Sequence, residues 1–298
     1  MAIYSKRSPE EQGKRDAGAV MRQLQGVHIK SVGTVRNYEQ GLRSVGTALA
    51  RQGERLKGLT PERAIEYLKD RAGQVAQKTL DLERQALQKM LQHVEKNLEP
   101  GQTLPVIKSA VETRLGSRAY TAQQVAAIAE KQSEKHALAT EIAYSAGLRA
   151  HELITLRPAD DRPADDRPAL PEKFSGRNGV FYTVEGKGGL VREVLIPVEL
   201  SDRLEKHRLD EPRSITDRGV HYQQHYDIGG GQQWSNSFSG ASERALGWSN
   251  GAHGLRHSYA QERMVEVQSA GLTKEHAQEV VSQEMGHFRP EITETYLR

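Results

Sequence analysis

A segment rich in proline and glycine, residues 99–118, divides the chain into two parts that differ in hydrophobic pattern. Such residues interrupt helices and strands, and here they are Pro100, Gly101, Pro105 and Gly116. The chain has 298 residues, which is enough for two compact domains of ordinary size. We therefore expect an N-terminal domain over residues 1–98, a linker over 99–118 and a second domain over 119–298.

The first part has the residue spacing of amphipathic helices. Its apolar residues recur three or four positions apart, which places them on one face of a helix. The clearest stripe consists of Val35, Tyr38, Leu42, Val45 and Leu49. Thr60 and Pro61 match an N-cap followed by proline at the first helical position. The pattern predicts four helices, at about 9–25, 34–52, 61–73 and 77–97.

The second part begins with a helical pattern and then changes to strands. Thr121, with Gln124 three residues later, matches a capping box, and a long helix is expected to run from there to about Ala146. Val180–Glu185 and Leu190–Ile196 are short runs rich in β-branched residues. Because glycines separate the two runs, we expect a β-hairpin.

The rest of the second part is expected to be mostly helical from about Ser201, with a loop at residues 229–231. Residues 157–169 repeat the unit RPADD in tandem, and their three prolines and four aspartates cannot build a packed element. This repeat is expected to be an exposed loop without a chemical role. The predicted fold class is mainly α with a small antiparallel β-sheet, in which a helical domain precedes an α+β domain.

Composition limits the chemistry and the location of the protein. Cysteine is absent, which excludes disulfides, thiolate metal sites and cysteine nucleophiles. The mean hydropathy is −0.69, and no run approaches the ~18 to 20 apolar residues that span a bilayer. The first fifteen residues have no apolar core of a secretory signal. A cytoplasmic protein that makes no membrane contact is expected.

The net charge of +3 is unevenly distributed. Residues 1–118 contain 21 Lys and Arg against 13 Asp and Glu, whereas residues 119–298 contain 21 against 26. A basic N-terminal part suits DNA binding, because phosphate contacts dominate affinity for DNA. A solvated helical surface explains the same bias equally well, so charge alone does not decide between the two.

Four short segments of the second part contain residue types that serve phosphate chemistry. In chain order they are GLRAHEL, GKGG, HGLRH and MGH, and a tyrosine follows the last by nine residues. The residues in question are Arg149, Lys187, His253, Arg256, His287 and Tyr296. Each of them alone would be an ordinary surface or packing residue. The glycines do not have the P-loop spacing, so nucleotide binding is not expected.

Taken together, these groups match the needs of a phosphodiester that passes through a pentacoordinate state. Arginine binds phosphate oxygens through two parallel hydrogen bonds and keeps its charge. A pre-placed donor of this kind is typically worth about 10²–10³ in rate. A tyrosine phenol, with a reference pKa of ~10, must lose a proton as it attacks. The departing 5′-oxygen must gain one, which suits a lysine at a flexible hairpin tip.

On these residues, the chain resembles the tyrosine recombinase (phage integrase) family over nearly its whole length. The Arg, Lys, His-x-x-Arg, His and Tyr boxes of that family are all present, in order and at similar spacing. The resemblance implies that Tyr296 attacks the scissile phosphate and leaves a 3′-phosphotyrosine and a free 5′-hydroxyl. It also implies that Arg149 and Arg256 hold the non-bridging oxygens.

The resemblance assigns roles to the remaining residues as well. Lys187 would act as the general acid toward the 5′-oxygen, and His253 would assist proton transfer from the tyrosine. His287 would hydrogen-bond the phosphate. Glu152 resembles the acidic residue that orients its neighbours in this family. No metal, ATP or other cofactor is implied, because the tyrosyl linkage keeps the energy of the phosphodiester.

As partners, the resemblance implies double-stranded DNA recombination sites, a homotetramer on two duplexes and DNA-bending accessory proteins. The N-terminal region resembles the core-binding domain that closes around DNA as a clamp, and the protein is expected at the nucleoid. Integration of a mobile element is favoured over resolution of chromosome dimers. Only Leu297 and Arg298 follow Tyr296. Many family members have a longer C-terminal segment there that docks on a neighbouring protomer, so another contact or a trimmed chain is expected.

Two other functions remain open at this point. A type IB topoisomerase-like enzyme would use the same chemistry to relax DNA without recombination. A non-catalytic DNA-binding protein of the same fold would bind DNA but would not depend on Arg149 or Tyr296. The complete set of residues makes the second alternative the weaker one.

Two further groups of residues invite other interpretations. His221 and His225 are four apart and would form a metal pair if they lay on a helix, but no third ligand accompanies them, so no metal is expected. A cluster of aromatic residues is expected to pack in the core, with contacts to bases or sugars as the alternative. Its members are Tyr222, Tyr226, Trp234, Phe238 and Trp248.

Overall fold

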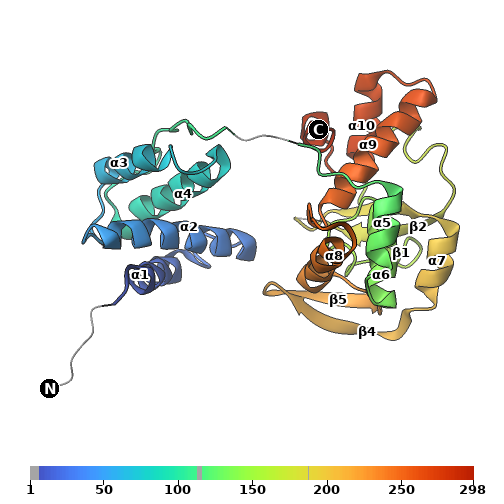
Figure 1. Cartoon of the computed structure of the whole chain (residues 1–298), viewed down its shortest axis with the longest axis horizontal. Helices are drawn as coiled ribbons and strands as arrows, with labels where there is room; N and C mark the ends of the chain where they lie inside the picture. Colours follow the sequence, from blue (N-terminus) through green and yellow to red (C-terminus); the bar gives the residue numbers. More distant parts are fainter. Residues whose placement is uncertain (1–6, 113–115, 187) are drawn as a thin grey trace. The chain divides into compact units, whose positions relative to one another are not determined.

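The computed structural model describes residues 7–112, 116–186 and 188–298. The chain forms two compact units, which are Met1–Arg114 and Leu115–Arg298 (Figure 1). Each unit has a hydrophobic core of its own. In the part of the chain that the structure describes, no helix is long and apolar enough to cross a membrane.

The first unit is helical, and the four helices predicted from the sequence are confirmed. They are α1 (Pro9–Leu24), α2 (Val32–Arg51), α3 (Pro61–Arg71) and α4 (Gln77–Met90), which continues into a π-helical turn, η1 (Leu91–Glu95). The predicted N-cap is also confirmed, because the Thr60 side chain accepts a hydrogen bond from the N–H of Arg63. An unpredicted capping box at Ser8 starts α1.

The core of the first unit is built around the apolar stripe of α2. Its fully buried members are Leu42, Val45 and Leu49. Helix α1 packs closely against α2 at two glycines. A Cβ atom on Gly13 would lie 2.5 Å from the backbone nitrogen of Thr47, and one on Gly46 would lie 3.0 Å from the Cα of Gly13. The two backbones can therefore approach only because both positions lack a side chain.

The first half of the segment expected as a linker packs against the first unit. Leu104 is 2% exposed, and its N–H donates to Gln88 Oε1 at 3.1 Å. Further along, Ser109 Oγ donates to the carbonyl of Val75 at 2.7 Å. These contacts make residues 104–109 an extension of the helical unit.

The second unit combines helices with two small antiparallel sheets. Its elements are α5 (Ala122–Ala129), α6 (Glu134–Ser145), β1 (Arg157–Pro158), β2 (Val180–Glu185), β3 (Val191–Ile196), α7 (Val198–Glu205), β4 (Arg208–Asp217), β5 (Val220–Tyr226), α8 (Gly231–Leu246), α9 (Gly254–Ser269), α10 (Lys274–Glu284), α11 (Pro290–Thr293) and a 3₁₀ turn, η2 (Glu294–Tyr296). Figure 1 shows them in green to red.

The predicted hairpin is confirmed as β2 and β3, which form the centre and one edge of a three-stranded sheet with β1 at the other edge. Its register pairs Tyr182 with Val194 and Val184 with Arg192. Tyr182, Val184 and Val194 are at most 1% exposed and belong to the main core of the unit.

The tandem repeat was expected to be an exposed loop, but part of it forms a strand. Its first Arg-Pro pair, Arg157–Pro158, forms β1, and Arg162 of the second copy donates to the carbonyls of Thr155 and Thr183 at 2.7 and 3.1 Å. Strand β1 lies at an edge of the sheet that the described residues form, and a proline is tolerated at an edge because it need not donate to a further strand. The repeat therefore supplies the edge of the sheet.

The long helix expected from Thr121 is divided in two. The capping box at Thr121 is present, but α5 ends at Ala129 and α6 begins at Glu134. In the turn between them, Gln132 Oε1 accepts a hydrogen bond from Thr140 Oγ1 at 2.7 Å. This side-chain contact, which the helical periodicity does not reveal, stabilises the turn between the two helices.

Strands β4 and β5 occupy a region that was expected to be helical. They form a hairpin whose turn residues Arg218 and Gly219 have φ angles of 51° and 79°. Two consecutive positive φ angles suit the twist of a two-residue hairpin turn. In the sequence, the Arg218-Gly219 pair between two strand-length runs could have indicated this hairpin.

The cluster of aromatic residues packs mainly in the core, as predicted. Tyr226, Trp234 and Phe238 are at most 1% exposed. Trp248 is 39% exposed, but its ring stacks on Tyr120 with centroids 5.4 Å apart.

Candidate active site

The second unit brings together five of the six residues proposed for catalysis. They come from four places: the turn after α6, the N-cap and first turn of α9, the segment after α10, and η2. These residues are Arg149, His253, Arg256, His287 and Tyr296. The sixth, Lys187, lies outside the described residues.

A tight turn after α6 presents Arg149. Gly147 has a φ of 61°, and a Cβ atom there would lie 2.7 Å from the ring of Tyr259. Any other residue would meet both a strained backbone and a steric clash. The backbone N–H of Arg149 donates to Glu152 Oε2 at 2.8 Å, and its Nη1 donates to Oε1 at 2.6 Å. The same carboxylate therefore orients the backbone and the guanidinium of Arg149.

Glu152 is fully buried and interacts with more than one arginine. Arg192 Nη2 donates to its Oε2 at 2.8 Å, and Arg256 Nη1 lies 3.8 Å from the same oxygen. Burial by itself raises the pKa of the Glu152 carboxyl. The three arginines outweigh burial and hold that pKa far below its ordinary value. Glu152 is therefore a permanent negative charge among positive ones.

Arg256 is also fully buried and connects two distant turns. Its Nη1 donates to the carbonyl of Gly147, and its Nη2 donates to the carbonyl of Met285 at 3.2 Å. Its Nε is buried and has no hydrogen-bond partner among the residues that the structure describes. Burial, followed by the charge of Arg149, lowers the pKa of the Arg256 guanidinium to about 10, so the group stays charged at neutral pH.

His287 is held in a defined protonation state. Its Nε2 lies 3.0 Å from Arg256 Nη2, and its Nδ1 lies 3.2 Å from Thr293 Oγ1. Because a guanidinium can only donate, Nε2 is the acceptor and Nδ1 carries the proton. Burial, and then Arg256, lower the pKa of His287 to about 3, so the imidazole is neutral at neutral pH.

Tyr296 lies inside this group, although it is near the end of the printed sequence. It is 8% exposed, and its ring centroid is 5.0 Å from that of His287 and 5.5 Å from that of His253. The guanidinium carbon of Arg256 lies 5.4 Å from the same ring centroid. The carbonyl of Tyr296 accepts a hydrogen bond from Gln261 of α9. The phenol is thus adjacent to the arginine and the two histidines.

His253 is more open to solvent than the other site residues. Its ring is nevertheless partly desolvated by the surrounding protein, and this desolvation, followed by the charge of Arg256, lowers its pKa. A neutral imidazole next to the phenol can accept a proton at neutral pH.

Three residues that touch the site were missed in the sequence. Arg192 is 4% exposed and contacts Glu152, Thr293 contacts His287, and the ring of His257 lies 4.8 Å from that of Tyr296. Of these, His257 ends the HGLRH segment that was singled out in the sequence, and Arg192 had a signal of a different kind. It stands at an inward position of β3, in alternation with Val194 and Ile196, where an apolar residue is the rule.

The turn between β2 and β3 begins beside the site. A Cβ atom built on Gly186, the preceding residue, would lie 3.4 Å from Glu152 Oε1. Gly188 and Gly189 have φ angles of 85° and 84°, and the Gly186 N–H donates to the carbonyl of Leu190 at 2.7 Å. The glycines that were noted in the sequence therefore form the turn of the hairpin.

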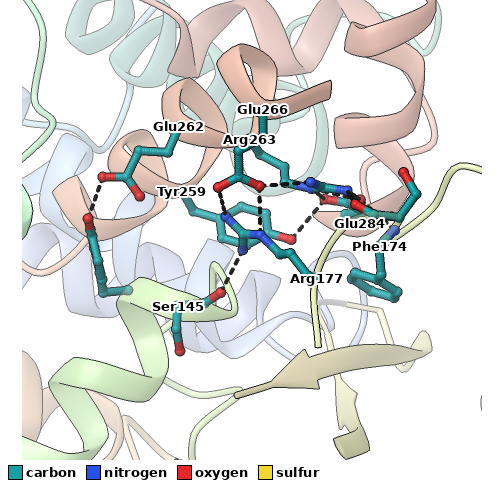
Figure 2. Close-up of polar contacts among 10 residues, drawn as sticks. Ser145, Phe174, Arg177, Tyr259, Glu262, Arg263, Glu266 and Glu284 are labelled. Carbon is teal, nitrogen blue, oxygen red and sulfur yellow. Dashed lines mark hydrogen bonds and ion pairs between the residues drawn. The ribbon is translucent and has the colours of Figure 1, made fainter. Parts of the chain in front are cut away.

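A second ionic network lies among residues of α9, the end of α10 and the loop that contains Arg177 (Figure 2). Glu284, the last residue of α10, accepts hydrogen bonds from Arg263 at 3.0 Å and from the Tyr259 hydroxyl at 2.8 Å. Arg177 donates to Glu266 of α9 and to the carbonyl of Ser145. These bonds join α6, α9 and the end of α10, from which the Met285-Gly286-His287 turn departs.

The proposed pair of His221 and His225 does not lie on a helix. Both residues are on strand β5, where positions four apart are roughly 13 Å apart along the strand. A single metal ion cannot bridge that separation. The premise of a helical metal pair is therefore wrong.

Comparison with protein families finds a match in the first unit. Residues 21–97 match the N-terminal SAM-like domain of phage integrases. A search among curated protein sequences finds no match.

Several solved structures share the fold of nearly the whole chain. A lambda integrase tetramer bound to a Holliday junction is 15% identical, with 94% of this chain and 76% of that chain covered and a TM-score of 0.58. The XerH site-specific recombinase in a post-cleavage complex with palindromic difH substrate is 15% identical. The match covers 99% of this chain and 94% of that chain, with a TM-score of 0.57. The Tn1549 transposon integrase in complex with transposon right end DNA is 14% identical. The match covers 95% of this chain and 94% of that chain, with a TM-score of 0.56. The predicted fold class is confirmed.

Proposed function

We propose that this chain, which has the tyrosine recombinase fold and an N-terminal domain of the phage integrase type, is a site-specific DNA recombinase. The observation that carries the proposal is the position of the Tyr296 phenol beside Arg256, His253 and His287 in one unit. Packing alone does not require a fully buried arginine and two neutral imidazoles beside a single phenol.

The proposed reaction is a transesterification, in which a phosphate ester of the DNA 5′-oxygen becomes an ester of the tyrosine. The Tyr296 hydroxyl oxygen attacks phosphorus, and the bond from phosphorus to the 5′-oxygen breaks. The phenolic proton passes to a base, for which we propose His253 because its imidazole is neutral. The 5′-oxygen gains a proton, and we propose Lys187 as the donor. The products are a 3′-phosphotyrosine and a 5′-hydroxyl, and attack by a 5′-hydroxyl reverses the step.

Arg149 and Arg256 are proposed to bind the non-bridging phosphate oxygens. Glu152 holds Arg149 through two hydrogen bonds and lies close to Arg256. Fixing the donors before substrate arrives avoids reorganisation during the reaction, which is the main source of electrostatic catalysis.

His287 must change its hydrogen bonding in this mechanism. In the free protein its Nε2 accepts from Arg256 and cannot donate to a phosphate. A bound phosphate would add negative charge beside the ring and raise its pKa. We propose that His287 then becomes protonated and donates a hydrogen bond to the phosphate.

The proposed partners are double-stranded recombination sites and three further copies of the chain. In support, one structure of the same fold is a tetramer on a Holliday junction, and another is a transposon integrase in complex with DNA. The integrase-type first unit and this fold likeness favour integration of a mobile element. DNA-bending accessory proteins and a location at the nucleoid remain part of the proposal.

The test is covalent trapping on a nicked half-site. The parent protein should form a protein–DNA adduct that resists denaturant, and Tyr296→Phe should abolish it, because no other hydroxyl replaces the nucleophile. Tyr222→Phe, on strand β5, is the matched control and should form the adduct normally. An adduct of equal yield with Tyr296→Phe would contradict the proposal. Relaxation of supercoiled DNA without site preference would instead favour a topoisomerase-like enzyme.

A further inference from the structure

Arg192 is a buried charge on the inner face of a strand. It is 4% exposed and pairs in register with Val184, which is fully buried. A buried arginine is costly unless its donors are satisfied, so its partners indicate why the residue is there.

The two partners of Arg192 belong to separate parts of the site. Its Nη2 donates to Glu152 Oε2 at 2.8 Å, and its Nη1 donates to the backbone carbonyl of Glu284 at 2.8 Å. Glu152 orients Arg149, whereas Glu284 is the last residue of the helix that precedes His287. The Arg192 guanidinium thus joins the Glu152 carboxylate, which orients Arg149, to the end of α10.

The aliphatic part of Arg192 also shapes the turn that carries His287. Gly286 has a φ of 69°, and a Cβ atom there would lie 2.5 Å from Arg192 Cδ and 3.0 Å from Nε. The N–H of His287 returns to the carbonyl of Ser282 at 2.9 Å. The turn therefore closes directly over the Arg192 side chain, and only glycine fits between them.

We propose that Arg192 is a positioning residue for DNA cleavage, which holds the Arg149–Glu152–Arg256 group and the His287 turn at a constant distance from one another. The inference rests on the proposed function. It adds a residue to the site that none of the sequence motifs contained.

A lysine could not replace this residue fully. The guanidinium reaches two acceptors at once through a rigid planar fork, whereas an ammonium is a single point of charge. Lysine would keep the positive charge and lose the bridge. Methionine would lose both, with a similar aliphatic length.

The first measurement is single-turnover cleavage of the nicked half-site at saturating DNA. We expect Arg192→Met to slow cleavage by about 100-fold and Arg192→Lys by about 10-fold, because small displacements of catalytic groups have effects of that size. DNA affinity should stay within about twofold, since Arg192 does not reach the surface.

Arg162 is the matched control for these variants. Its side chain is 15% exposed and donates to two backbone carbonyls of the same unit. Its hydrogen bonds to the described residues include none to Glu152 or to α10. Arg162→Lys and Arg162→Met should cleave within about threefold of the parent. Equal losses at Arg162 and Arg192 would overturn the proposal, as would near-parental cleavage by Arg192→Met.

A second measurement does not depend on DNA. The charged groups that act on the His287 ring are Arg256 of α9, Arg149, Arg192 of β3, and Glu152. Titration of His287 by NMR should show a higher pKa in Arg192→Met, because one positive neighbour is gone, and a nearly parental pKa in Arg192→Lys. An unchanged pKa in Arg192→Met would overturn the proposal.

The two readouts separate the possible failures. If the parent protein forms no covalent adduct, the proposed function fails, while the titration still decides whether Arg192 acts on the His287 turn. Should Arg192→Met not fold, as judged by circular dichroism, Arg192→Lys carries the cleavage test. Parental cleavage by Arg192→Lys would then overturn the proposal.

Discussion

Among the single residues of the site, Glu152 has the most demanding environment. It is inaccessible to solvent, yet it remains ionised because Arg149, Arg192 and Arg256 surround it. Its energetic role follows from that arrangement. A buried carboxylate of this kind compensates charges that would otherwise be unpaired in the interior.

Replacement of Glu152 by glutamine should therefore affect both stability and cleavage. We expect Glu152→Gln to lower the free energy of unfolding by about 3 kcal/mol, in the range for breaking a buried ion pair. Cleavage should slow as well, since the guanidinium of Arg149 loses its charged partner. Urea unfolding and single-turnover cleavage are the measurements. Glu199→Gln, at an exposed position of α7, should change neither, and a neutral outcome for Glu152→Gln would refute the argument.

At the scale of elements, contacts between helices override the helical preferences of individual residues. Helix α1 contains two glycines, which are poor helix formers. Gly13 faces α2 at close range, whereas the nearest atom to a Cβ on Gly18 would be Arg22 Nη1 at 3.7 Å. The same substitution should thus have opposite effects at the two positions.

Alanine at Gly13 should destabilise the first unit by about 1–3 kcal/mol, because the added carbon would overpack the contact between α1 and α2. Alanine at Gly18 should stabilise it by up to about 1 kcal/mol through the gain in helix propensity. Urea unfolding followed by circular dichroism compares the two variants directly. Equal effects at both positions would show that the close approach of the helices does not matter energetically.

At the scale of the whole molecule, the neutral histidines of the site make stability depend on pH. Burial, followed by Arg118, lowers the pKa of His257 to about 4, and burial followed by Arg256 lowers that of His287 to about 3. In the unfolded chain a histidine titrates near 6.5. Below that pH the unfolded state takes up protons that the folded state does not bind, so stability falls as the pH falls.

We expect stability to be constant above about pH 7 and to fall between pH 6.5 and 4. The slope should approach roughly 1.4 kcal/mol per pH unit for each of the two groups. Urea unfolding at pH 7.5, 6 and 5 measures it. His257→Gln should reduce the slope, whereas His221→Gln, at an exposed position of β5, should not. A pH-independent stability would contradict the assignment of buried neutral imidazoles.

Local sequence patterns were sufficient for the elements with strong periodicity. Helices α1 to α4, the β2–β3 hairpin and the capping box at Thr121 follow from residue spacing and turn chemistry. Glu152 lies three residues after Arg149 and accepts a hydrogen bond from its guanidinium. These features depend on residues close together in the chain, so the sequence alone contains the information.

Other features were decided by contacts between residues far apart in the chain. The break between α5 and α6, the β4–β5 hairpin and the edge strand made by the repeat all escaped the sequence patterns. So did Arg192, which becomes a site residue only because the sheet places it between Glu152 and the carbonyl of Glu284. The sequence by itself determined which chemical groups are available and in what order. The tertiary structure decided that Arg192 and Arg256 share the buried Glu152 carboxylate with Arg149, because these contacts form only when distant segments meet.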